Sequence, residues 1–390
     1  MTKKSPDEVS GLLNEGSSNP QLETACALAA SSAPAKPIND YVELKKLIKK
    51  DGLLDKQPIY YTYKIITTIG IMALSVVFLF TIHSFWFQIF NALLLAVGTA
   101  QLGFLGHDGG HRQIFHSTRK NEILTLITGD LLIGMSNGWW LNKHNAHHSH
   151  PNEVDMDPDI DLGVLAFTEE DVRNKTGLQR LIVKNQKYFF FPLLSLLGID
   201  LQRNSLLYLL HNKEKNRALE MLLLVLHHAL YLGLLFYCLN PWQAVIFMLI
   251  HQLAFGVFLG MAFAPNHKGM PILEKNSRVD FLRRQVLTSR NVHSGLFNDF
   301  WYGGLNYQVE HHLFPSMPRK NLKKAQKIVE AYCREHDIAY YETSAVQSFR
   351  EILTFLHDVS APLRARKAQA GKSVIVKPVR KIRVLLGKLL

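Results

Sequence analysis

Cysteine is scarce in this chain, and its scarcity excludes two kinds of structure. The 390 residues include three cysteines, Cys26, Cys238 and Cys333, and no two of them have the spacing of a disulfide framework or of a thiolate metal site. A reducing compartment is therefore compatible with the composition.

The two ends of the chain lack other features. Residues 1–38 contain no apolar core and are rich in Ser, Ala, Asn and charge, so we expect a disordered tail and no secretory signal. From Ser360 onward basic residues face no acidic residue, which suits an anionic membrane surface. The net charge of +12 could also indicate nucleic acid. Nothing in the chain supplies a recognition fold, however, and we expect no nucleic-acid partner.

Four apolar runs lack acidic and basic side chains, and each is close to the roughly 20 residues that a helix needs to cross a bilayer. The runs are Ile65–Ile82, Phe87–Leu105, Met221–Leu239 and Trp242–Ala264. Their readily ionisable residues are His227, His228 and His251. We expect these histidines to make hydrogen bonds between helices, because neutral imidazole is the least costly ionisable group in lipid.

Lysine and arginine are absent from the short links inside each pair of runs, at 83–86 and 240–241, and abundant before and between the pairs. The positive-inside rule then places both termini and the central region on the cytoplasmic side. The sequence predicts an all-α, multi-pass membrane protein with four transmembrane helices in two hairpins and a helical cytoplasmic cap. We expect a membrane domain at 39–358 and a basic tail at 359–390, in a bacterial inner membrane or the endoplasmic reticulum.

Two further apolar stretches, Ile123–Trp140 and Tyr188–Leu210, contain polar and charged interruptions. Making either of them a full span would force an awkward topology. We therefore predict interfacial or partly buried helices there, and soluble helices within 322–358.

Histidines form three clusters on the face assigned to the cytoplasm. The candidate ligands in them are His107, His111, His144, His147, His148, His311 and His312. On a helix, residues three and four apart share one face, so these imidazoles can point at a common centre. A single histidine at a membrane boundary usually has a hydrogen-bonding role. Seven buried together without a cation would leave most of their nitrogens unpaired, which favours a shared metal site.

The number and type of ligands limit the choice of metal. Seven imidazoles are too many for one structural or catalytic zinc, so two metal ions fit better. Imidazole suits iron, copper, nickel and zinc. The absence of paired thiolates and of a Glu-x-x-His motif argues against an iron–sulfur cluster and a carboxylate-bridged centre. A di-iron centre is favoured, while dicopper and dizinc centres remain open.

The three clusters, in this order and separated by two membrane hairpins, resemble the membrane fatty acid desaturases and their hydroxylase relatives. The resemblance covers about residues 60–320. Gln308, which stands in place of the first histidine of the third cluster, is similar to the front-end acyl desaturases. Those enzymes place a new double bond between an existing one and the carboxyl end. The stretch HNAHHSHPNEVDMDPDID, beginning at His144, matches the same group.

The resemblance implies two iron ions that activate dioxygen, removal of two hydrogens from a methylene pair, and release of water. The substrate would be a long acyl chain carried as acyl-CoA or as a membrane lipid. Eukaryotic front-end enzymes carry a fused cytochrome domain with a His-Pro-Gly-Gly motif. That motif does not occur here, and the region ahead of Ile65 is too short for such a domain. A separate electron donor, a ferredoxin or a cytochrome with its reductase, is therefore expected.

Further residues near the clusters are candidates for supporting roles. His267 is similar to a family position that adds one more iron ligand, and Asn266 beside it could hold a metal-bound water. Gln308 is expected close to the ligands. Carboxylates that could accept the free N–H of a ligating imidazole, or could equally be solvated loop acids, are Asp108, Asp130, Asp157 and Asp159. Aromatic residues that could line an acyl tunnel, or could belong to a membrane belt, are Trp139, Trp140, Trp301 and Tyr302.

Two other functions remain open from the sequence. A hydroxylase or ketolase on the same scaffold would insert oxygen, and the spacing of the clusters barely separates this chemistry from desaturation. A membrane metal transporter would instead place histidines or acids along the spans. The three clusters lie on one face, which favours the enzyme.

Overall fold

The computed structural model describes residues 37–213 and 215–364 of the chain. Most of the predicted tail at 1–38 and of the basic tail at 359–390 lies outside these residues. The described part is mostly helical, as predicted. Four helices are long and apolar enough to cross a membrane. They are α3 (Pro58–Thr81), α4 (Phe85–Gly110), α11 (Arg217–Cys238) and α12 (Pro241–His267).

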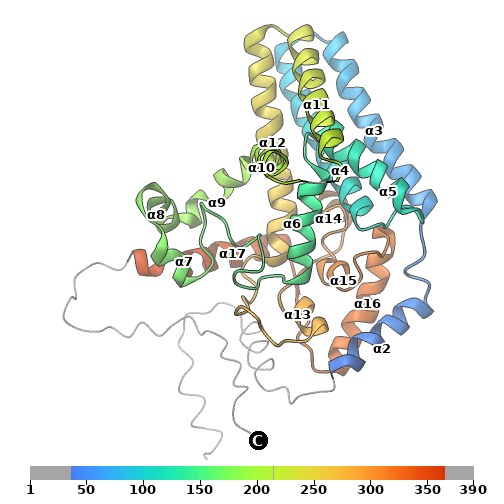
Figure 1. The fold of residues 1–390 in the computed structure, drawn as a ribbon, viewed down its shortest axis with the longest axis vertical. Coiled ribbons are helices and arrows are strands. Elements are labelled where there is room, and N and C mark those ends of the chain that lie inside the picture. The colour runs from blue at the N-terminus through green and yellow to red at the C-terminus, as the bar shows by residue number, and fades with distance from the viewer. Residues whose placement is uncertain (1–36, 214, 365–390) are drawn as a thin grey trace, which may run out of the picture.

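These four helices stand side by side at one end of the molecule (Figure 1). Pro58 and Pro241 occupy the first turns of α3 and α12, where a missing backbone N–H costs nothing. Asn240 and Gln243 form a capping box at the start of α12. The outer helices α3 and α11 leave most of their apolar side chains exposed, while α4 and α12 bury more of theirs.

Helices α4 and α12 both extend beyond their predicted apolar runs and carry histidines at their ends. Helix α4 continues from Leu105 to Gly110 and includes His107, and α12 continues to His267. A Cβ atom on Gly110 would lie 2.5 Å from the Trp140 ring, so glycine permits the close approach of the helix that carries Trp140. Gly109 and Gly110 therefore allow dense packing at the last turn of α4, which ends at Gly110.

The histidines within the apolar helices are hydrogen-bonded, which confirms the prediction for two of them. His251 Nε2 lies 3.1 Å from Thr99 Oγ1, and the Tyr231 hydroxyl lies 2.8 Å from His251 Nδ1. These contacts connect α12 with α4 and α11. His227 Nδ1 lies 3.0 Å from the carbonyl oxygen of Leu131. His228 instead bonds within its own helix.

The two ambiguous apolar stretches form shorter helices. The first contains α5 (Thr118–Thr125), the π-helix η3 (Leu126–Ile133) and the start of α6 (Asn137–Ser149). The second contains α9 (Gln186–Ser195) and α10 (Leu197–His211). Within the described ranges, neither is among the helices long enough to cross a membrane. Gly134 ends η3 with a φ of 80°, a conformation that favours glycine.

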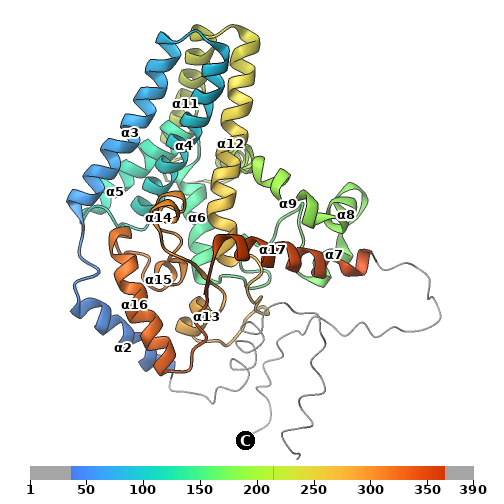
Figure 2. The same ribbon diagram turned by 180° about the vertical axis from the view of Figure 1, so that it is seen from behind.

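The remaining elements lie below the four long helices (Figure 1, Figure 2). The helices are α2 (Pro37–Lys50), α7 (Glu169–Asn174), α8 (Gly177–Lys184), α13 (Phe281–Leu287), α14 (Leu296–Trp301), α15 (Gln308–Leu313), α16 (Arg319–Glu335), α17 (Ala345–Val359) and the 3₁₀ turn η4 (Ala361–Leu363). The prediction of an all-α chain missed one small pairing. Strand β1 (Asn291–Val292) runs parallel to β2 (Glu342–Thr343), with Asn291 opposite Glu342.

Arg290 connects these elements to the end of α12. Its side chain is fully buried and donates to Glu351 of α17 and to the carbonyl oxygens of Pro265 and Lys268. A buried guanidinium needs such partners, because an unpaired charge in the interior is costly. Arg290 therefore holds α17 against the segment that carries His267.

Replacing Arg290 tests this connection. We expect Arg290→Ala to lower the free energy of unfolding by about 3–5 kcal/mol, because it leaves the Glu351 carboxylate buried without its cation. Arg334→Ala is the control, since Arg334 pairs with Glu330 at the surface and such pairs contribute about 0–1 kcal/mol. Denaturant unfolding of the detergent-purified proteins measures both. Equal free energies of unfolding for the two variants would contradict the role of Arg290 in holding α17 against the end of α12.

Candidate metal centre

Five imidazoles gather where the ends of three helices meet. They are His107 from α4, His111 directly after it, His144 and His148 from α6, and His311 from α15. The Nε2 atoms of His107 and His311 are 3.1 Å apart, as are those of His148 and His311. The Nε2 atoms of His111 and His144 are 2.8 Å apart. We call this set the five-histidine group.

A second set, the three-histidine group, lies beside the first and contains His147, His267 and His312. The Nε2 atom of His267 is 3.3 Å from that of His147 and 3.1 Å from that of His312. The rings of His148 and His312 stack with centroids 4.1 Å apart, so the two groups are adjacent. Helix α6 contributes to both of them.

The geometry fits a metal ion in each group. Ligand nitrogens at about 2.1 Å from a metal and at right angles to each other lie about 3 Å apart. This matches the separations between the Nε2 atoms. Burial, together with neighbouring imidazoles, lowers the pKa of several histidines well below its ordinary value. They are His111, His144, His148, His311 and His312. Neutral imidazole is the form that binds metals, and the converging lone pairs call for a cation.

Asp108 and Arg319 hold the imidazole of His107. His107 Nδ1 lies 3.1 Å from Asp108 Oδ1, so its N–H can donate to the carboxylate and leave Nε2 free for a metal. Arg319 Nε donates to Asp108 Oδ2 at 2.8 Å, and Arg319 Nη2 donates to the carbonyl oxygen of Phe104 at 3.0 Å. No sequence pattern pointed to Arg319, because it comes from α16 and meets Asp108 only through the tertiary fold.

Asp157 holds His147 in the same way. His147 Nδ1 lies 3.0 Å and 3.1 Å from the two carboxylate oxygens of Asp157, which also accept the backbone N–H groups of Asn152 and Asp159. Burial would raise the pKa of Asp157, but His147 and these hydrogen bonds outweigh it and hold the pKa below its usual value. The Asp159 carboxylate lies farther away, at 3.6 Å, and pairs with Lys143.

Two orienting groups that the sequence analysis missed face the three-histidine group. His312 Nδ1 lies 2.8 Å from Gln285 Oε1, and Gln285 Nε2 donates to the carbonyl oxygen of His148 at 3.0 Å. His267 Nδ1 lies 3.0 Å from the carbonyl oxygen of Thr288. Both partners come from α13 and the turn after it, and neither has a local pattern that could have identified it.

Gln308 and Asn266 also lie at the three-histidine group. Gln308 Nε2 is 2.9 Å from His267 Nε2, and Asn266 Nδ2 donates to Gln308 Oε1 at 3.1 Å. The side chain of Gln308 therefore stands where a fourth imidazole would complete the group.

Asp130 contacts the backbone and not an imidazole. Its Oδ2 accepts the N–H of Asn137 at 3.2 Å, at the start of α6. We expected Asp130 to accept the N–H of a metal-binding imidazole. The geometry does not support that role, because the hydrogen-bonding partner of Asp130 is a main-chain amide.

The four predicted tunnel aromatics occupy different places. Trp140 stacks on His144 with ring centroids 4.5 Å apart, while Trp139 is buried and stacks on none of the described histidines. Trp301 stacks on a phenylalanine of α12 with centroids 4.1 Å apart, and Tyr302 is buried beside it in the same hydrophobic cluster.

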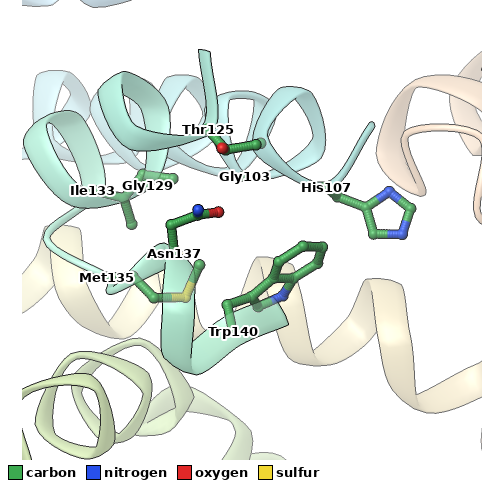
Figure 3. Close-up of a pocket in the computed structure, with 9 residues that line it drawn as sticks. Gly103, His107, Thr125, Gly129, Ile133, Met135, Asn137 and Trp140 are labelled. Atoms are coloured by element: carbon green, nitrogen blue, oxygen red, sulfur yellow. The ribbon is translucent and has the colours of Figure 1, made fainter. Parts of the chain in front are cut away.

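A small pocket opens beside His107 (Figure 3). Small and apolar side chains dominate its lining, which consists of Gly103, Gly106, His107, Thr125, Gly129, Ile133, Met135, Asn137 and Trp140. Helices α4, α5, η3 and α6 supply these residues, except for Met135, which lies in the link between η3 and α6. Of the predicted tunnel residues, Trp140 is the one that lines this pocket.

Asp108→Asn tests the orienting role of the carboxylate. An amide cannot accept the imidazole N–H as strongly as a carboxylate, so we expect iron affinity to fall about 10–100-fold. Iron titration of the purified protein measures this. Asp155→Asn is the control, because Asp155 is exposed and pairs with Lys275 at the surface. An unchanged affinity of Asp108→Asn for iron would contradict the role of this carboxylate in orienting His107.

Comparisons with known proteins identify the family of the chain. The family model described as fatty acid desaturase matches residues 84–344, which is more than half of the chain. The chain is 33% identical over 337 residues to the acyl-lipid (9-3)-desaturase of Physcomitrium patens, covering 83% of this chain and 63% of that protein.

Two further relatives are matched over more of their own length. The Delta(6)-fatty-acid desaturase of Caenorhabditis elegans is 31% identical over 348 residues, which is 85% of this chain and 77% of the relative. The Delta(8)-fatty-acid desaturase of Euglena gracilis is 30% identical over 369 residues, which is 91% and 86% of the two chains. The chain therefore belongs to the fatty acid desaturase family.

Proposed function

We propose that this protein is an oxygen-dependent desaturase that introduces a cis double bond into a long acyl chain at a centre of two iron ions. The observation that carries the proposal is the pair of adjacent histidine groups next to an apolar pocket. In the reaction, one dioxygen, two electrons and two protons take two hydrogens from a methylene pair, and two waters form. Bound iron would supply this oxidation.

The two histidine groups divide the task of holding the metals. The five-histidine group offers five imidazole donors, and the three-histidine group offers three, with Gln308 beside them. Asp108 and Asp157 fix the orientation of one imidazole in each group. Histidine is the donor throughout, which suits iron but also other transition metals. The choice of iron rests on the family.

The pocket beside His107 would select the carbon atoms. A methylene pair carries no functional group, so its position relative to the oxidant has to determine which bond reacts. The lining offers glycine, isoleucine and methionine surfaces to an alkyl chain, and Trp140 separates the pocket from the ring of His144. Trp139, Trp301 and Tyr302 would then support the wall or the deeper path of the chain.

The membrane arrangement completes the proposal. Helices α3 with α4 and α11 with α12 form two hairpins, and the remaining elements form a cytoplasmic cap within one domain at 39–358. The tight links at their far ends lack basic residues, whereas the lower elements are rich in them. Both termini and the metal centre face the cytoplasm, and the bilayer delivers the acyl substrate.

The relatives support a front-end position for the new double bond. Three of them are named Delta(6), Delta(8) and acyl-lipid (9-3) desaturases. Gln308, in place of the first histidine of the third cluster, is the feature of this chain that resembles front-end desaturases. The substrate is an acyl-CoA or an acyl lipid that already contains one double bond.

Expression in a host with defined fatty acids tests the reaction. Mass spectrometry of the fatty acids should find products two mass units lighter, with the new double bond on the carboxyl side of an existing one. A gain of one oxygen would instead identify a hydroxylase. Metal movement across vesicles without any new fatty acid would identify a transporter.

His147→Ala tests the three-histidine group. His147 lies at the centre of contacts with His267 and His312, so we expect its loss to remove the metal from that group and to lower product at least 100-fold. Product and iron content are measured together in the same preparation. His116→Ala is the control, because His116 is exposed on the loop after the first cluster. Full activity of His147→Ala would contradict the proposal.

The electron donor is a separate acidic ferredoxin or cytochrome that docks on α16. The first three turns of α16 contain no acidic residue. Four exposed lysines lie three or four residues apart on one side of this helix: Lys320, Lys323, Lys324 and Lys327. Arg319, at the start of the same helix, contacts Asp108, which contacts His107. The basic surface of α16 and the five-histidine group are therefore linked by one ion pair, and opposite charge accelerates association.

Changing all four α16 lysines to glutamine tests this surface. We expect the KM for a reduced ferredoxin or soluble cytochrome to rise about tenfold at low salt and its salt dependence to flatten, while kcat stays the same, because steering acts on association. Steady-state kinetics at several salt concentrations measure both quantities. The exposed pair Arg173→Gln and Arg180→Gln is the control. An unchanged KM for the lysine variant would exclude this docking surface.

A further inference from the structure

A pair of buried carboxyl groups lies outside the histidine groups. Asp130 in η3 has no exposed surface, and Glu220 in the first turn of α11 is 2% exposed. Within the described residues, neither side chain forms an ion pair. Two buried acids without a cation are costly unless a proton neutralises one of them.

Both carboxyl groups bind the start of α6. Asp130 Oδ2 accepts the N–H of Asn137 at 3.2 Å. Glu220 Oε2 accepts the N–H of Gly138 at 3.1 Å and the hydroxyl of Ser136 at 2.6 Å. The Ser136 oxygen accepts in turn from the N–H of Trp139 at 3.1 Å. The first amides of α6 are thus satisfied by acids from two other helices, and negative charge is favourable at that end of a helix.

The burial of this pair favours a proton on Asp130. Asp130 Oδ1 is buried and has no acceptor or donor partner among the hydrogen bonds of the described residues. Burial, together with the neighbouring Glu220, raises the pKa of Asp130 to about 9. A carboxyl group with this pKa keeps its proton at neutral pH, and Glu220 would then carry the negative charge that the α6 amides bind.

The same segment forms one wall of the pocket. Gly129, which precedes Asp130, lines the pocket together with Ile133 and Asn137. Gln202 Nε2 donates to the carbonyl oxygen of Ile133 at 2.7 Å, which ties this wall to α10. The position of the wall thus depends on contacts from outside the histidine groups.

We infer that Asp130 and Glu220 are positioning residues that share one proton and hold the η3–α6 wall of the pocket, so that they set which methylene pair of the acyl chain faces the metal centre. This inference rests on the proposed desaturase function. The histidines of α6 lie against histidines from α4, α12 and α15, which help to keep them in place. Asp130 and Glu220 therefore affect the position of the pocket wall more than the binding of metal.

Amide and alanine variants separate proton sharing from simple packing. In Asp130→Asn the amide mimics the protonated acid, and in Glu220→Gln the side-chain oxygen still accepts from α6. We expect both to keep the wild-type position of the double bond. Asp130→Ala and Glu220→Ala should lower product at least tenfold and spread the double bond over neighbouring positions, with iron content within twofold of wild type. Glu122→Ala, an exposed acid on α5 that contacts Asn216, is the control.

Several results would overturn the inference. They are a wild-type double-bond position in both alanine variants, a loss of product in Asp130→Asn equal to that in Asp130→Ala, and a loss of iron in the alanine variants. If the alanine variants fail to fold, Ser136→Ala replaces them, because it removes one contact of Glu220. We expect this variant to place the double bond at several neighbouring positions. An unchanged position would overturn the inference.

A second readout does not depend on the reaction. Hydrogen exchange at the amides of Asn137 and Gly138 should be at least tenfold faster in the alanine variants than in the amide variants, and equal rates would overturn the inference. If wild-type protein yields no desaturated product while this difference is present, the proposed function fails and the positioning role stands.

Discussion

The converging lone pairs of eight imidazoles impose the main constraint on this molecule. Their Nε2 atoms approach one another within 2.8–3.3 Å in the pairs described above, a spacing that neutral nitrogens tolerate when a cation lies between them. Each ring must also be held so that Nδ1 donates elsewhere. Asp108, Asp157 and Gln285 serve this purpose. Much of the polar interior exists to keep these rings in place.

Local periodicity predicted that these histidines converge, but not their division into two groups. On α6, His144 and His148 are four residues apart and differ by about 40° around the helix, whereas His147 lies about 60° from His144 on the side away from His148. The first two therefore face the five-histidine group and His147 faces the other. Arg319 and Gln285 had no such pattern, because each reaches its partner across hundreds of residues or from an unrelated helix. The π-helix and the true contacts of Asp130 also depend on tertiary packing.

Hydropathy located the four long helices but placed the ends of two of them too early. The prediction ended the second run at Leu105, because the next turn is polar, yet α4 continues to Gly110. That polar turn carries His107 and packs against α5 and α6, so it is stabilised by protein contacts and not by lipid. The same holds for the end of α12 at His267. A transfer scale detects the part of a helix that faces lipid, and misses the part that faces the metal centre.

The division of α6 between the two histidine groups has a thermodynamic consequence. Because His144, His147 and His148 belong to one rigid helix, an ion in either group restricts the motion of all three rings. The entropic cost of ordering α6 is then met by the first ion, and the second binds to rings that are already aligned. If each group holds an ion, binding of the first would favour binding of the second, and the two groups would load together.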